Sequence, residues 1–116
     1  MTLEGFYTQI GGNYQEVFSR LCTEDRILKF VQKYPADPTF HQLEDAVSRS
    51  DWSGAFSAAH TLKGVALNLD FGDLYRSASN LTEALRGGAV LSDPSLWDAV
   101  VQSQQTLLDA ISQLTA

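Results

Sequence analysis

The sequence predicts an all-α protein, an antiparallel up-and-down four-helix bundle with a short N-terminal helix. Apolar residues recur at spacings of three and four along nearly the whole chain, and no stretch alternates apolar with polar residues as a strand would. Short clusters of Gly, Pro and Asp separate the periodic segments. The 116 residues are 44% hydrophobic and 19% charged, enough for one core without disulfides. We therefore expect residues 1–116 to be a single domain, with the core bundle over about residues 13–114.

Several short helical segments are expected in the N-terminal third. We expect residues 3–10 to form a short helix closed by a glycine pair, with Phe6 and Ile10 over one end of the bundle. Asn13 is a candidate N-cap for a second segment, and Thr23 is a candidate start for a third. The apolar faces of these two segments are Tyr14, Val17, Phe18 and Leu21, and then Ile27, Leu28, Val31 and Tyr34.

Two prolines interrupt the third segment. Pro35 and Pro38 cannot continue a helix, and Asp37-Pro38 has the form of an N-cap followed by a first helical residue. We expect a new helix over residues 40–48, with its apolar residues turned inward. Those residues are Leu43, Ala46 and Val47.

Three longer helices are expected in the remainder. Ser50 or Asp51 caps a helix over about residues 52–69, and Gly87-Gly88 ends a second helix over residues 71–86. Asp93-Pro94 starts the last one. The second helix carries a bundle seam of Phe71, Leu74, Ala78, Leu81 and Leu85. The last helix places six apolar residues on one side: Trp97, Val100, Val101, Leu108, Ile111 and Leu114.

Composition and charge narrow the classes of function. The net charge of −6, with scattered basic residues, argues against nucleic-acid binding. The first residues contain neither a basic region nor a long apolar run, so we expect no signal peptide, no membrane span and a cytoplasmic location. Cys22 is the only cysteine, and we expect it to be a small core residue. With only His41 and His60 beside it, a zinc site lacks ligands.

The helix over residues 52–69 carries an outward histidine. At 100° per residue, the apolar stripe lies opposite His60. It consists of Ala58, Leu62, Val65 and Leu69, with Ala55, Ala59 and Ala66 beside them. Within about 60° of His60 lie Ser53, Phe56, Ser57, Lys63, Gly64 and Leu67. We therefore expect the imidazole to be exposed rather than part of the core.

The neighbours of His60 favour a functional site over random exposure. Gly64 lies in a helix interior, where glycine costs about 1 kcal/mol relative to alanine, and the core pattern does not require it. A missing side chain beside an exposed imidazole would let another macromolecule approach closely. Phe56 and Leu67 are either ordinary exposed residues or the rim of a docking patch.

The motif around His60 resembles that of histidine-phosphotransfer (HPt) domains of phosphorelay signalling. It comprises His60-Thr61-Leu62-Lys63-Gly64, preceded by Asp51-Trp52 and Ala58-Ala59, followed by Asn68-Leu69, with Leu74, Leu81, Glu83 and Leu85 in the next helix. The resemblance covers roughly residues 13 to 114. Asp70 stands where the family usually has glycine, with Gly72 two places later, and aspartate tolerates left-handed backbone better than most residues. We expect an altered form of the turn.

The resemblance implies a relay intermediate rather than a turnover enzyme. His60 would accept a phosphoryl group from the aspartyl phosphate of a receiver domain and pass it to another receiver, while Lys63 compensates phosphate charge. The residues expected to contact the partner are Phe56, Ser57, Gly64, Leu67, Thr82 and Arg86. The chain itself would need no cofactor or metal, because the Mg²⁺ belongs to the receiver.

The partners that the resemblance implies are response-regulator receiver domains and a hybrid histidine kinase, bound by a monomer. An alternative is a silent HPt-like interaction module that binds or inhibits a receiver or histidine kinase. The intact His60, Lys63 and Gly64 favour transfer, whereas the negative charge of Asp70 leaves room for the alternative.

Overall fold

The chain is all-helical in a computed structural model that describes residues 1–115. No strand occurs among these residues, which confirms the predicted class. The helices are α1 (Leu3–Gln9), α2 (Tyr14–Leu21), α3 (Glu24–Lys33), α4 (Thr39–Ser48), α5 (Trp52–Leu69), α6 (Gly72–Ala84) and α7 (Ser95–Thr115), with 3₁₀ turns η1 (Tyr34–Ala36) and η2 (Arg86–Gly88). The molecule measures 41 × 25 × 20 Å.

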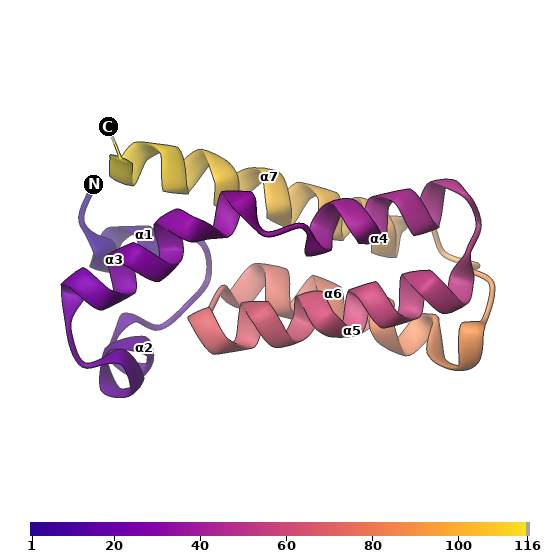
Figure 1. Cartoon of the computed structure of the whole chain (residues 1–116), viewed down its shortest axis with the longest axis horizontal. Coiled ribbons are helices and arrows are strands. Elements are labelled where there is room, and N and C mark those ends of the chain that lie inside the picture. Colours follow the sequence, from indigo (N-terminus) through magenta and orange to yellow (C-terminus); the bar gives the residue numbers. More distant parts are fainter. Residues whose placement is uncertain (116) are drawn as a thin grey trace.

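The longer helices lie lengthwise beside one another. α5 packs most extensively against α6 and α4, and α6 packs against α7. Figure 1 shows α3 and α4 following each other along one row, with α1, α2 and α3 gathered at the end of the molecule where both termini lie. The histidine helix α5 is therefore covered by neighbours along part of its circumference only.

The interruption between α3 and α4 is confirmed. α3 ends at Lys33, η1 follows, and α4 begins at Thr39 rather than at Pro38. The Asp37 carboxylate accepts a hydrogen bond from the Thr39 backbone N–H at 2.8 Å, but the N-cap of α4 is Pro38, so the predicted cap at Asp37 was wrong by one residue. Asn13 and Thr23 do act as N-caps, because their side chains accept from the Glu16 and Arg26 backbone N–H groups at the starts of α2 and α3.

Most of the buried residues of α5 are alanines. The fully buried residues of α5 are Ala55, Ala59, Leu62 and Ala66, and the predicted seam of α6 is buried throughout. Ala58, Val65 and Leu69, predicted to be central in the stripe, are only partly buried. The buried face of α5 is thus turned toward the alanine side of the predicted stripe.

Two predictions about the core were wrong, and two buried residues of α7 were not predicted. Cys22 is exposed, because it ends α2 in a left-handed conformation (φ 71°) instead of facing inward. Val101 is 38% exposed, whereas Leu107 is buried although the sequence analysis did not select it. Gln104 is also buried. Its side-chain oxygen is satisfied there, because it accepts a hydrogen bond from the Tyr34 hydroxyl at 2.5 Å.

The turn between α5 and α6 explains Asp70. It is left-handed (φ 56°, ψ 41°), and its backbone N–H donates to the Ala66 and Leu67 carbonyls. Its carboxylate accepts the Asn13 backbone N–H at 2.5 Å. The Tyr7 hydroxyl donates to the Leu69 carbonyl at 2.9 Å, and burial raises the Tyr7 pKa, with Asp70 adding to the effect. Asp70 therefore keeps the turn and joins it to the N-terminal segment.

Candidate functional site

α5 begins at a well-defined cap and carries His60 near its middle. The Asp51 carboxylate accepts the Gly54 backbone N–H at 3.0 Å, which settles the choice between Ser50 and Asp51 as N-cap. Eighteen helical residues then follow without a break. The prediction that His60 lies on the exposed face is confirmed, since its side chain is exposed while Ala59 beside it is fully buried.

His60 lies in an open depression of about 400 Å³. Its lining residues are Phe56, Ser57, His60, Lys63 and Arg86. The Phe56 and His60 rings have centroids 6.2 Å apart and are tilted by 45°. Five residues selected from sequence thus meet at one place, four from α5 and Arg86 from the turn η2 beyond α6. We call this the His60 pocket.

Two cations border the His60 pocket. The Arg86 guanidinium lies over the Phe56 ring, 5.9 Å from its centroid, and donates to both Glu83 carboxylate oxygens, at 2.6 and 3.2 Å. These hydrogen bonds and the Arg86 charge lower the pKa of Glu83, and Lys63 adds a smaller effect in the same direction. Glu83 in turn raises the pKa of Arg86. The pocket is therefore bordered by Lys63, which takes part in no ion pair among the described residues, and by Arg86, whose charge is paired with that of Glu83.

Gly64 and Leu67 extend the exposed face of α5 beyond the His60 pocket. A Cβ built on Gly64 would meet no atom within 4 Å, so the backbone there is bare. Leu67 is 49% exposed. Neither residue lines the pocket, but both are accessible on the histidine helix, as predicted for residues that a partner would cover.

Thr82 was wrongly predicted to face a partner. It is fully buried, and its hydroxyl donates to the Ala78 carbonyl at 2.7 Å, one turn earlier in α6. Glu83, which the sequence analysis did not select as a site residue, borders the site instead. Its spacing of three to Arg86 is the signal that could have found it, because residues three apart on a helix are neighbours.

Neither a metal-binding cluster nor a membrane-spanning helix occurs in the part of the chain that the structure describes. In residues 1–115, no three His, Cys, Asp or Glu side chains gather closely enough to hold a metal ion. Within the same residues, no helix has the length and apolarity that crossing a bilayer requires.

A family model described as Hpt domain matches residues 30–116. The match covers most of the chain and includes all the residues of the His60 pocket, and the chain belongs to the Hpt domain family. Membership implies histidine-containing phosphotransfer in a phosphorelay, with receiver domains and kinases as the partners of the family. Neither the curated proteins nor the solved structures give a significant match to the chain.

Proposed function

We propose that this chain is a phosphorelay intermediate in which His60 carries the phosphoryl group between the aspartates of two receiver domains. The observation that supports the proposal is the exposed imidazole in a pocket bordered by Lys63 and Arg86, with the bare backbone of Gly64 four residues on. The family supplies the reaction class, and the exposed face of α5 offers one histidine that can perform it.

The transfer step exchanges one bond to phosphorus for another. The unprotonated nitrogen of a neutral imidazole attacks the phosphorus of the aspartyl phosphate in line; a P–N bond forms, the P–O bond breaks, and the aspartate leaves as a carboxylate. Onward transfer reverses these roles with a second receiver's aspartate as nucleophile. Such transfer depends mainly on positioning and charge compensation.

Each pocket residue has a role that follows from its place. Lys63 and Arg86 offset the charge of the phosphoryl oxygens, and Phe56 carries the Arg86 guanidinium on its ring. Ser57, Gly64 and Leu67 form the surface that the receiver covers. The Mg²⁺ needed for the aspartyl chemistry belongs to the receiver.

Three further points belong to this proposal. We infer that the row α3–α4 and the helices α5, α6 and α7 act as the four members of an up-and-down bundle that holds His60 rigidly. We also expect a monomer, because a receiver must reach the exposed face of α5. The cytoplasm is the location that we expect for such a relay.

The negative charge of Asp70 does not favour the alternative of a silent interaction module. Ten residues of helix separate Asp70 from His60, which is roughly 15 Å at 1.5 Å per residue. The Asp70 carboxylate is also bonded to the Asn13 N–H. Its charge therefore acts on the α5–α6 turn and not on the His60 pocket.

A small phosphodonor and two histidine variants test the proposal. Phosphoramidate and a phosphorylated receiver are each incubated with the wild type, His60→Gln and His41→Gln. His41 is a matched control, because its side chain is 76% exposed on α4 and pairs with Glu44. We expect phosphohistidine, detected by ³¹P NMR, in the wild type and His41→Gln only. Receivers that bind but never transfer a phosphoryl group to His60 would support the silent module instead.

A further inference from the structure

A second depression lies on α3, away from the His60 pocket. It has a volume of about 540 Å³ and is lined by Leu21, Thr23, Asp25, Arg26, Lys29, Phe30 and Lys33. A neighbouring depression of about 290 Å³ shares Leu21 and Phe30 with it and reaches α5 at Val65, Asn68 and Leu69. We call the two together the α3 groove. It shares no lining residue with the His60 pocket.

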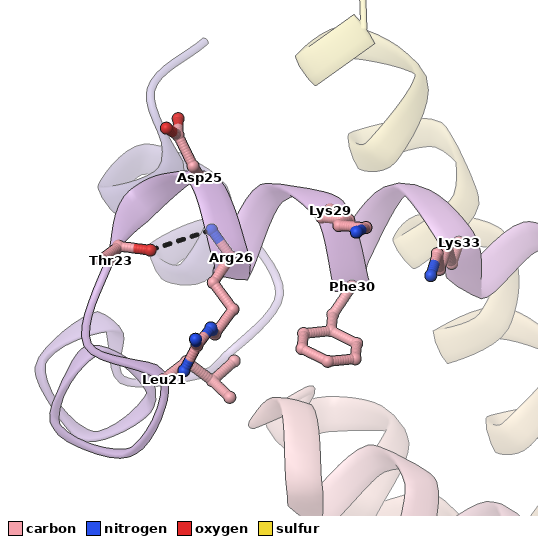
Figure 2. Close-up of a pocket in the computed structure, with 7 residues that line it drawn as sticks. All are labelled: Leu21, Thr23, Asp25, Arg26, Lys29, Phe30 and Lys33. Atoms are coloured by element: carbon pink, nitrogen blue, oxygen red, sulfur yellow. Dashed lines mark hydrogen bonds between the residues drawn. The ribbon is translucent and has the colours of Figure 1, made fainter.

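The floor of the α3 groove is apolar. Phe30 is 43% exposed, and in Figure 2 its ring points away from α3 toward the neighbouring helix. Leu21, Val65 and Leu69 are each partly buried. The floor is open because α3 touches α5 at few points, whereas α4 packs along α5 extensively. An apolar side chain entering here would cover surface that the chain itself leaves in water.

The rim of the groove is positively charged. Arg26, Lys29 and Lys33 follow one another at spacings of three and four along α3, as Figure 2 shows. Within residues 1–115, none of the three takes part in an ion pair, whereas Arg49, Arg76 and Arg86 are each paired with an acid three or four residues earlier in the sequence. Three cations and one carboxylate, that of Asp25, line this part of the groove, so a chain of net charge −6 keeps a local excess of positive charge beside an exposed aromatic ring.

We propose that the α3 groove binds an acidic peptide segment of a partner protein, with an apolar side chain of that segment seated against Phe30. Charge complementarity selects the acidic residues, which would pair with Arg26, Lys29 and Lys33, and the floor selects the apolar anchor. A partner held there leaves His60 accessible, so the groove would raise the effective concentration of an attached receiver at the His60 pocket. The binding itself does not require phosphotransfer.

A designed peptide tests the groove directly. The probe is a helical peptide rich in glutamate with leucines at helical spacing, compared with one in which lysine replaces glutamate and one in which serine replaces leucine. Titration into ¹⁵N-labelled protein should shift the amides of Leu21, Phe30, Val65 and Leu69 with the first peptide only. Binding should also weaken as salt increases.

Variants of the chain identify the contacts. Lys29→Glu combined with Lys33→Glu, and Phe30→Ala separately, should each weaken binding at least tenfold. Arg49→Glu is the control for charge reversal, because Arg49 is exposed on α4 outside the groove, and it should leave the affinity unchanged. Circular dichroism confirms that each variant is folded.

Several outcomes would overturn the proposal. These are equal binding of the lysine peptide, no binding of the glutamate peptide, amide shifts centred on the His60 pocket, or preferential binding of phosphatidylserine vesicles. Phosphoramidate labelling of His60, measured with the peptide bound, is an independent readout. Loss of labelling in the free chain would count against the proposed function and not against the groove.

Discussion

Gly64 and Gly72 lie eight residues apart and occupy opposite environments. Nothing comes within 4 Å of a Cβ placed on Gly64, beside the exposed histidine. A Cβ placed on Gly72 would collide with the backbone carbonyl of Gly11, because the loop after α1 packs directly on the start of α6. One glycine leaves open space beside its helix, whereas the other lets two parts of the same chain meet. Under the proposed function, the space at Gly64 admits a partner, while Gly72 serves the packing of the chain on itself.

The largest expected effect concerns stability and compares two leucines on opposite faces of α5, one buried and one exposed. Leu62→Ala should lower the free energy of unfolding by about 3 kcal/mol, because Leu62 is fully buried and its removal leaves a cavity. Leu67→Ala is the matched control, since Leu67 is 49% exposed and should change stability little. Urea denaturation measures both. Similar losses for the two variants would contradict the assignment of faces on α5.

Gly72→Ala should come next, with a loss of about 2 kcal/mol from overpacking against the Gly11 carbonyl. The measurement is again urea denaturation, with the amide spectrum recorded to follow Gly11 and Gly12. Phosphorylation of His60 by phosphoramidate should survive at temperatures where the variant is folded. A stable variant with an unchanged spectrum would show that the two segments are not in close contact.

Gly64→Ala should act in the opposite sense. We expect it to stabilise the chain by about 1 kcal/mol, because alanine is the better helix former and its methyl group meets no neighbour. Transfer from a receiver should slow, whereas labelling by the small donor phosphoramidate should not. Thr61→Ala, at another exposed position of α5, controls for general changes in the helix. Unchanged transfer would mean that no partner approaches Gly64.

The smallest effect concerns charge in the His60 pocket. Because Arg86 lowers the pKa of Glu83, the ion pair persists as pH falls below 4.5 and is lost as pH passes through the lowered value. Arg86→Gln should raise the Glu83 pKa toward 4.5, leaving only the smaller effect of Lys63. A ¹³C NMR titration of the Glu83 carboxyl measures the shift. Arg49→Gln, in a separate ion pair, should leave it unchanged.

Local chemistry made much of the fold predictable from sequence. The caps at Asn13, Thr23 and Asp51 and the seam of α6 follow from residue types at short spacing, and the structure confirms them. The exposure of His60 followed from the same periodicity. Helix periodicity and capping depend on neighbours in sequence, which is why they could be recognised without coordinates.

The wrong predictions concern residues whose burial depends on segments that are distant in the sequence. Leu107 and Gln104 are buried because α7 faces several helices at once, and a single-helix pattern does not say which neighbour covers which side. Thr82 could be buried because its hydroxyl is satisfied by the Ala78 carbonyl, an option that polarity alone does not reveal. Glu83 was not selected although its spacing of three to Arg86 indicates an ion pair, whereas the position of Arg86 at the His60 pocket depends on the turn after α6.

The bond from Tyr7 to Leu69 and the one from Asn13 to Asp70 have a practical consequence for domain dissection. The family match starts at residue 30, yet α1, which lies outside it, supplies Phe6. The ring centroids of Phe6 and Phe71 are 6.3 Å apart. A fragment limited to residues 30–116 would lack Phe6. The Leu69 carbonyl and the Asp70 carboxylate would also lose their hydrogen bonds to Tyr7 and Asn13 and would bond to water instead. Expression work on this protein should therefore retain the first 29 residues, because Tyr7 and Asn13 among them hold the α5–α6 turn.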